Sequence, residues 1–279
     1  YYLGRPNNFP LYRGFIINRK LNAMSGITVK DMQKLQADNY NVFAEIARPV
    51  LLKYLATSNL NIDEKKYLEI FKQWNCNNDL KEIGATVFKV FWDSVEVNMW
   101  GDEYAQTKLT LPWPDESALI ESLMKDSTYN FADDVRTPNK KETIADIILI
   151  SFQKAAKQLA TLEKENKLEW ALYKDTKVEH LLKLPALNRF HLPIGGGKYS
   201  INATKQNHGP SWRMIVQMTD NIEAYGIYPG GQNGNPGSKF YDSFIDTWAA
   251  GKYYRILFIK KEAAEKSEQM KWHLTFEKA

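Results

Sequence analysis

The pattern of apolar residues changes once along this chain, and that change constrains the fold more than any other feature. Up to about residue 166, apolar side chains recur at helical spacing in successive segments. After about residue 185 they alternate, in short runs bounded by glycine and asparagine. Helices followed by strands are typical of α+β proteins. We therefore expect an α+β fold, with a mainly helical lobe over residues 1–185 and a β-rich segment over residues 186–279.

Several segments in the first part of the chain are predicted to be helical. They are about 29–56, Asp63 to Trp74, Ile83 to Trp100, Asp115 to Leu123, and about 140–166. Thr28 and Asp31 have the spacing of a capping box before the first of these helices, which Pro49 is expected to bend. Four tryptophans fall on apolar helical faces, so we expect them in the core: Trp74, Trp92, Trp100 and Trp248.

Alternating residues predict strands in the last part of the chain. These are 211–218, 223–228 and 254–259, with Trp272 to Phe276 as a last strand. Between the second and third strands, a glycine-rich loop precedes a short amphipathic helix through Phe240 and Trp248. Gly251 follows it at a position where helices often end.

Composition and charge exclude several classes of protein. The 279-residue chain has 44% hydrophobic and 25% charged residues, as folded globular proteins do. Its net charge is +4 and opposite charges are interspersed, so no nucleic-acid partner is predicted. The longest apolar run, Ile147–Ile150, is far shorter than the roughly 20 residues of a membrane span, so no span is predicted. The single cysteine, Cys76, cannot form an internal disulfide.

Residue types that often carry catalysis form no recognisable motif. The spacing of the histidines matches no zinc-ligand pattern, and Cys76 lies between two asparagines without basic neighbours. The Gly195–Lys198 segment lacks the first glycine and the Ser or Thr of a phosphate-binding loop, so we interpret it as a turn. On these grounds alone, a binding module, a structural domain and part of an enzyme all remain open.

Four motifs follow one another in the C-terminal third of the chain. They are His208–Asp220 (HGPSWRMIVQMTD), Ile227–Pro236 (IYPGGQNGNP), Ser238–Asp242 (SKFYD), and Trp248 with Gly251–Tyr253. Together they resemble the C-terminal signature of the penicillin acylase (penicillin amidase) family. Similar motifs near the start of the chain are Tyr1–Gly4, Tyr12–Arg13, Ile27–Thr28, Asp31–Met32 and Leu35–Asp38. Residues 56–165 match the family only in helical character.

This resemblance implies an N-terminal-nucleophile hydrolase with a four-layer αββα sandwich. The sandwich would be incomplete in this chain, which would supply the helical lobe and the C-terminal strands. In this family a precursor cleaves itself, and the freed N-terminal serine of the large chain attacks an amide with its own α-amino group as base. An amine with a pKa of about 8 can serve as that base at neutral pH. Because the sequence has no Gly-Ser-Asn-x-Trp site, we expect the serine upstream of Tyr1. This chain would then be the C-terminal part of the large chain, inactive alone.

Arg13 is the one residue to which the resemblance carries a functional role. The family's Y-R-A-x-R-I motif holds an arginine that supports the asparagine of the oxyanion hole, and a guanidinium can orient an amide carbonyl. This chain keeps the first arginine of the motif and has Ile16 in place of the second. A supporting role for Arg13, a surface or packing role, and loss of the function all stay open. Asn7–Asn8 comes too late in the motif order to receive the asparagine's role. For Arg213 we expect a structural use.

The resemblance also implies partners and a location. The expected partners are the rest of the acylase precursor, meaning the small chain and the N-terminal part of the large chain, and a small-molecule amide substrate. No cofactor is expected within this chain, and a structural calcium ion upstream would agree with the resemblance. The location would be periplasmic or secreted. Two other interpretations stay open: an acylase-like module without catalysis, which Ile16 favours, and an aromatic-rich binding domain.

Overall fold

The structure, a computed structural model, describes residues 11–125, 129–259, 261–264, 267–268 and 270–278. Contacts between residues divide the chain into two compact units. The first unit comprises Tyr1–Gly26 and Lys34–Pro210, and the second comprises Ile27–Gln33 and Ser211–Ala279. The helix α2 (Val29–Gln36) therefore contributes its first residues to the second unit and its last residues to the first.

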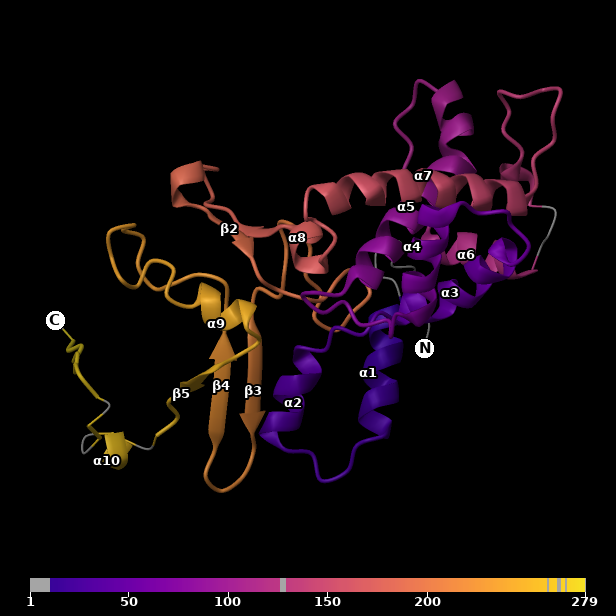
Figure 1. The fold of residues 1–279 in the computed structure, drawn as a ribbon. Helices are drawn as coiled ribbons and strands as arrows, with labels where there is room; N and C mark the ends of the chain where they lie inside the picture. Colours follow the sequence, from indigo (N-terminus) through magenta and orange to yellow (C-terminus); the bar gives the residue numbers. More distant parts are fainter. Residues whose placement is uncertain (1–10, 126–128, 260, 265–266, 269, 279) are drawn as a thin grey trace. The chain divides into compact units, whose positions relative to one another are not determined.

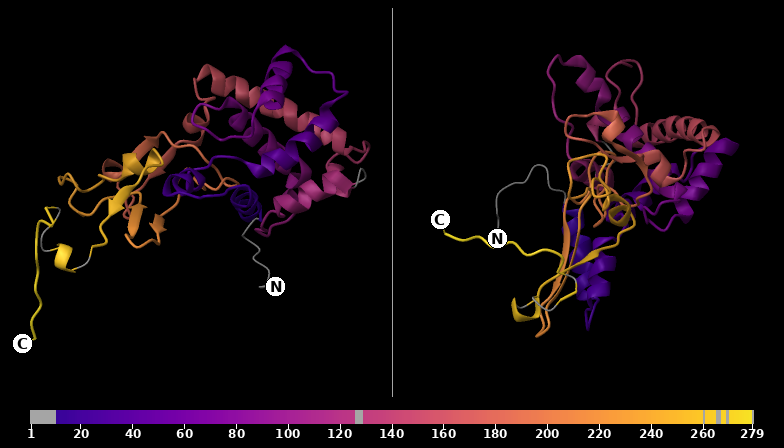
Figure 2. Two further views of the ribbon diagram at one scale, coloured as in Figure 1. Left: turned by 90° about the horizontal axis from the view of Figure 1, so that it is seen from below. Right: turned by 90° about the vertical axis from the view of Figure 1, so that its left-hand side faces the viewer.

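The first unit is a helical bundle centred on the packing of α5 against α7 (Figure 1). Its longer helices are α1 (Tyr12–Asn22), α3 (Val42–Leu55), α4 (Ile62–Gln73), α5 (Ile83–Gln106), α6 (Glu116–Lys125) and α7 (Ile144–Lys164). The helices α5 and α7 lie alongside each other in the views of Figures 1 and 2, and α3 and α4 also pack against α7. Within the described part of the chain, no helix combines the length and the apolar character that crossing a membrane requires.

Aromatic side chains dominate the core of this unit. Trp74, Trp92 and Trp100 are buried, and so is Trp248 in the second unit, which confirms the prediction from helical spacing. Phe43 on α3 meets Trp92 on α5 edge to face, with ring centroids 4.7 Å apart and an interplanar angle of 85°. Such pairs stabilise a core beyond the burial of their area, by about 0.5–1.5 kcal/mol.

The predicted single helix over 29–56 is wrong, because the chain leaves the helical conformation between α2 and α3. Asn41 interrupts it: its side-chain oxygen accepts a hydrogen bond from the Ala44 backbone N–H at 3.0 Å and caps a new helix. Pro49 lies inside α3. The capping box before α2 is confirmed, since the Thr28 N–H donates to Asp31 Oδ2 at 3.0 Å and the Asp31 N–H donates to Thr28 Oγ1 at 3.3 Å.

The other predicted helices are confirmed with shifted ends. The helix α4 is capped by Asn61 in a reciprocal box with Glu64, rather than by Asp63, which lies in its first turn. The helix α5 extends past Trp100 to Gln106. The helix α7 begins after Thr143, whose side chain forms a second capping box with Asp146.

Short elements complete the first unit. They are the 3-10 turns η1 (Asn130–Ala132) and η2 (Pro185–Leu187), the helix α8 (Trp170–Lys174), and the antiparallel strands β1 (Thr176–Val178) and β2 (Arg189–Leu192). Neither α1 nor these elements were predicted. Elements of three to five residues are too short for a period of 3.6 or 2 to be visible in the sequence.

The second unit contains a three-stranded antiparallel sheet in the order β3–β4–β5. The strands are β3 (Arg213–Gln217), β4 (Glu223–Ile227) and β5 (Tyr254–Ile256) (Figure 1). Arg213 pairs with Ile227. Three of the four predicted strands are therefore confirmed, the third in shortened form. The short helix α9 (Ile245–Ala249) is confirmed in shortened form, because Phe240 lies before it in turns, and Gly251 after it has the positive φ of 68° typical of a helix end. A further short helix is α10 (Lys261–Ala264).

The fourth predicted strand, Trp272 to Phe276, is wrong. These residues form no strand in the described structure, and Trp272 is 92% exposed. Alternation of apolar and polar residues gives a strand only where a neighbouring strand supplies hydrogen bonds.

Candidate functional site

Arg13, the predicted site residue, lies in the first turn of α1. Its side chain is half-buried, and it forms no hydrogen bond or ion pair with another residue of the described ranges. Asn7–Asn8 and the Tyr1–Gly4 motif lie outside the described residues. The role of Arg13 beside an oxyanion hole therefore stays a prediction.

Ile16, which replaces the second arginine of the motif, is a core residue. Its side chain is 0% exposed. An arginine there would bring a charged group into an apolar environment, which is strongly unfavourable without a partner. The replacement therefore agrees with the local packing of α1.

A second arginine of α1, Arg19, is held in a charged cluster that sequence reasoning missed. Its guanidinium donates two hydrogen bonds to the Glu45 carboxylate, at 2.9 and 2.8 Å. The Tyr40 hydroxyl donates to the same carboxylate at 2.5 Å. The Arg19 guanidinium holds the pKa of Glu45 below its usual value, and burial together with Glu45 raises the pKa of Tyr40 to about 12. No local spacing relates Arg19 to Glu45, because they lie 26 residues apart.

Backbone groups of distant loops join beside this cluster. The Asn202 N–H donates to the Asp38 carbonyl at 2.9 Å, and the Asn202 amide donates to Asn39 Oδ1 at 2.9 Å. The Ser200 hydroxyl donates to the Asn39 carbonyl at 2.9 Å, and Lys20 of α1 binds the Asp38 side chain. The loop after α2 and the loop at 200–202 are therefore fixed to each other.

The Gly195–Gly197 segment is a buried loop that approaches other backbone closely. Gly196 has φ of +80°, and a Cβ atom there would lie 2.1 Å from the Asn202 carbonyl oxygen. The Gly196 N–H donates to the Asn78 carbonyl at 2.8 Å, and the Gly197 N–H donates to the Asn202 carbonyl at 3.1 Å. Because these N–H groups bind the protein itself, the loop is not arranged to bind phosphate.

The ammonium group of Lys174 binds this loop. Its Nζ donates to the Gly195 carbonyl and to Thr204 Oγ1, both at 2.6 Å, and the side chain is buried. Burial lowers the pKa of Lys174 to about 7. An amine beside a hydroxyl is a combination that can activate a nucleophile. Here both groups are buried and the Thr204 hydroxyl binds the Gly195 carbonyl, so the pair supports the loop.

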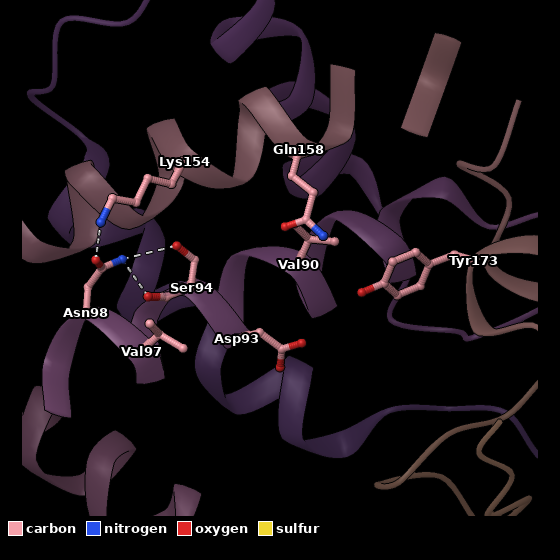
Figure 3. Close-up of a pocket in the computed structure, with 8 residues that line it drawn as sticks. All are labelled: Val90, Asp93, Ser94, Val97, Asn98, Lys154, Gln158 and Tyr173. Atoms are coloured by element: carbon pink, nitrogen blue, oxygen red, sulfur yellow. Dashed lines mark hydrogen bonds between the residues drawn. The ribbon is translucent and has the colours of Figure 1, made fainter. Parts of the chain in front are cut away.

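A surface pocket of about 250 Å³ lies along α5 and α7, and its lining side chains are shown in Figure 3. Asn98 accepts a hydrogen bond from Lys154 at 2.5 Å and donates to the Ser94 carbonyl at 2.7 Å. The Tyr173 hydroxyl and the Asp93 carboxylate turn toward each other across the pocket. Burial, and secondarily Asp93, raises the pKa of Tyr173 to about 12, so its hydroxyl stays protonated. This pocket offers hydrogen bonds and no activated nucleophile.

The other nucleophile and metal candidates are not assembled into a site within the described ranges. Cys76 is buried, and burial raises the pKa of its thiol, which favours the unreactive form. His191 Nδ1 lies 2.7 Å from Asp175 Oδ1 on the surface. No group of three or more His, Cys, Asp or Glu side chains in the described part of the chain is arranged to hold a metal ion.

The signature motifs of the C-terminal third hold the second unit together. Arg213 of β3 is buried and donates to the Trp248 carbonyl of α9 at 2.9 Å, in agreement with the structural use expected for it. In the glycine-rich loop, the Gln232 N–H donates to the Phe240 carbonyl at 2.8 Å. A Cβ atom at Gly231 would lie 2.0 Å from that carbonyl oxygen, so only glycine fits there.

Comparison with known proteins shows which family shares these motifs. A sequence model of the family described as penicillin amidase matches residues 1–265. The chain belongs to the penicillin amidase family. The family assignment made from the motifs is thereby confirmed, and the match also covers the helical centre, where sequence motifs gave no support.

Relatives of this penicillin amidase family member include an enzyme and a solved structure. Acyl-homoserine lactone acylase QuiP of Pseudomonas syringae pv. syringae (strain B728a) is 30% identical over 145 residues, which are 44% of this chain and 17% of that protein. The thermostable penicillin G acylase of Alcaligenes faecalis is 12% identical, with a TM-score of 0.50, and the match covers 94% of this chain and 52% of that chain. The second likeness shows a shared fold and confirms the predicted α+β class. The chain thus spans at most about half the length of these relatives.

Proposed function

We propose that this chain is the C-terminal part of the large chain of an amidohydrolase that cleaves linear N-acyl amide bonds through an N-terminal serine located upstream of Tyr1. The observation that carries the proposal is the family match over residues 1–265. The α-amino group of the serine would act as general base, so that no histidine is required.

The described residues agree with a supporting role for this chain beside a nucleophile that lies elsewhere. Three candidate reactive groups, Cys76, Lys174 and Thr204, are buried, and the motifs of the C-terminal third hold backbone in place. Such an arrangement is expected of a part that supports an active centre. We also propose Arg13 as a positioning residue. Its guanidinium would hold the asparagine of the oxyanion hole in place.

For the substrate class, we propose an amide with an acyl group on one side and a small amine on the other. One relative is named an acyl-homoserine lactone acylase and another a penicillin G acylase. Both names describe an acylase, one of acyl-homoserine lactones and one of penicillin G. N-acyl homoserine lactones and phenylacetyl amides are therefore the first substrates to test.

The test uses the full-length gene product. A gel shows whether the precursor separates into two chains, and release of primary amine is then measured with both substrate classes. Turnover that disappears when the serine at the start of the large chain is replaced by alanine supports the proposal. A correctly processed, folded protein that releases no amine from either class contradicts it and favours the acylase-like module without catalysis.

A further inference from the structure

A second pocket of the first unit, here called the Glu96 pocket, lies on another face of α5. It has a volume of about 170 Å³, and the rings of Phe88, Trp92, Trp170 and Tyr199 contribute to its walls. Glu96, one helical turn after Trp92, lines the same cavity. Since a cavity of about 150 Å³ can hold benzene, the Glu96 pocket has room for a small organic molecule.

The carboxylates in and next to this pocket, Asp93, Glu96 and Glu116, outnumber its two lysines. Its two lysines already have partners, because Lys89 binds Asp93 and Lys198 Nζ lies 3.0 Å from Glu116 Oε2. Glu96 has no ion pair with any other residue of the described ranges. A carboxylate that forms no ion pair and lies beside aromatic rings favours a cationic ligand.

A buried acceptor lies in the same wall. Asn78 is 3% exposed and lines the pocket, and its Oδ1 has no hydrogen-bond donor among the described residues. Buried carbonyl oxygens are rarely left without a donor. A ligand that brings a polar hydrogen would satisfy this atom.

We propose that the Glu96 pocket binds a small organic ammonium ion, with the Glu96 carboxylate as counter-ion, the aromatic rings as its walls, and Asn78 Oδ1 as acceptor for a polar hydrogen. The same rings already lie near cations of the protein. Lys198 Nζ is 5.0 Å from the centre of the Tyr199 ring, and Lys174 Nζ is 5.9 Å from that of Trp170. The proposal does not rest on the amide hydrolysis proposed above.

Binding should depend on pH in a defined direction. Burial raises the pKa of Glu96 to about 7, with Asp93 and Glu116 as further raising charges and the Trp92 indole and Lys198 as lowering groups. Since the ammonium ion binds the ionised carboxylate, its affinity should increase by about tenfold from pH 6 to pH 8. The other charged or titratable groups that line the pocket are Lys89 and Tyr199. Lys174, whose pKa is also about 7, does not line it, but its Nζ lies 5.9 Å from the centre of the Trp170 ring in the pocket wall.

The experiment is calorimetric titration of the full-length protein with choline and with its neutral isostere, 3,3-dimethylbutan-1-ol, at pH 6 and pH 8. Choline combines a trimethylammonium group with a hydroxyl that can donate to Asn78. We expect choline to bind at least tenfold more tightly than the alcohol at pH 8. E96Q should remove this preference and its pH dependence. E103Q is the matched control, because Glu103 is on the same helix, has a pKa of about 7, and does not line the pocket.

Each alternative outcome overturns the proposal. Equal binding of choline and the alcohol shows an apolar cavity without a cation site, and no binding of choline at millimolar concentration shows no site. A pH dependence that persists in E96Q belongs to a group other than Glu96 and contradicts the proposal. If E96Q does not fold, F88L is tested instead, because it keeps apolar volume and removes an aromatic ring. Unchanged choline binding in F88L contradicts the proposal. Weakened choline binding, with Glu96 intact, supports it.

Discussion

Lys174 Nζ lies 2.6 Å from the carbonyl oxygen of Gly195, in a position where the lysine side chain is almost fully enclosed. Its three hydrogen-bond acceptors are neutral oxygens of Gly195, Gly196 and Thr204. A buried ammonium without a carboxylate gives up protons easily, and the pKa of Lys174 accordingly falls from 10.5 to about 7.

The first prediction concerns the pH dependence of stability. Between pH 7 and about 10 the unfolded chain keeps the Lys174 proton and the folded chain releases it, so the free energy of unfolding should rise with pH in this interval. The contribution of Lys174 is about 1.4 kcal/mol per pH unit at most. K174M should remove this part of the slope, which urea unfolding of both proteins at pH 7, 8 and 9 measures. Parallel curves for the two proteins would show that Lys174 does not titrate in this range.

The second prediction concerns the buried glycine loop. G196A should lower the free energy of unfolding by more than about 3 kcal/mol, because the residue has positive φ and the added Cβ would overlap the Asn202 carbonyl. G14A is the matched control: Gly14 lies in α1 with nothing within 4 Å of an added Cβ. This control should gain about 0.5–1 kcal/mol from higher helix propensity. Similar effects of the two changes would refute the close packing of the loop.

The third prediction concerns the Arg19–Glu45 pair. Both side chains are more than a third exposed, so solvent screening limits the pair despite its two hydrogen bonds. A double-mutant cycle with R19A and E45Q should give a coupling of about 0.5–1 kcal/mol. E45Q alone should have the larger effect, since Glu45 also binds the Tyr40 hydroxyl. A coupling of zero would mean that the pair does not form in solution.

Much of the fold could be predicted because it depends on local patterns. The helices α5 and α7 and the strands β3 and β4 are long enough for their apolar period to be visible, and the capping box at Thr28 uses short-range spacing. The break between α2 and α3 was missed because Asn41 competes with continued helix through its side chain. The prediction of a strand at Trp272–Phe276 was wrong because alternation in the sequence does not show whether a partner strand is present.

The site could be predicted only through motifs. They indicated the family and pointed to Arg13, but they say nothing about groups that meet across long sequence distances. Lys174 and Thr204 lie 30 residues apart, and Arg19 and Glu45 lie 26 residues apart. The Gly195–Lys198 segment was predicted to be a turn. Its close contacts with Asn78 and Asn202 could not be predicted, because only folding brings these residues together.

The fourth prediction concerns Arg13 in the complete enzyme. If its guanidinium holds the asparagine of the oxyanion hole, R13A should lower kcat by about 10- to 1,000-fold with a smaller change in KM. R13K should restore little activity, because an ammonium group lacks the planar fork. R19A on the same helix is the control and should keep kcat within about twofold. A normal kcat for R13A would make Arg13 structural.

Ile16 gives a related stability prediction. Because Ile16 is fully enclosed, I16R should lower the melting temperature of the protein and should not raise kcat. Thermal unfolding and the amine-release assay on the same sample separate the two effects. A folded I16R protein with higher kcat would show that the missing arginine belongs at position 16.

The nucleophile proposed for the full-length protein is a serine at the start of the large chain, upstream of Tyr1. It is tested most directly by treating the processed full-length protein with phenylmethylsulfonyl fluoride and locating the adduct by peptide mass spectrometry. We expect one stoichiometric adduct, on the N-terminal serine peptide of the large chain, with parallel loss of amine release. A stoichiometric adduct on a residue between Tyr1 and Ala279, or complete turnover after the serine is modified, would contradict it.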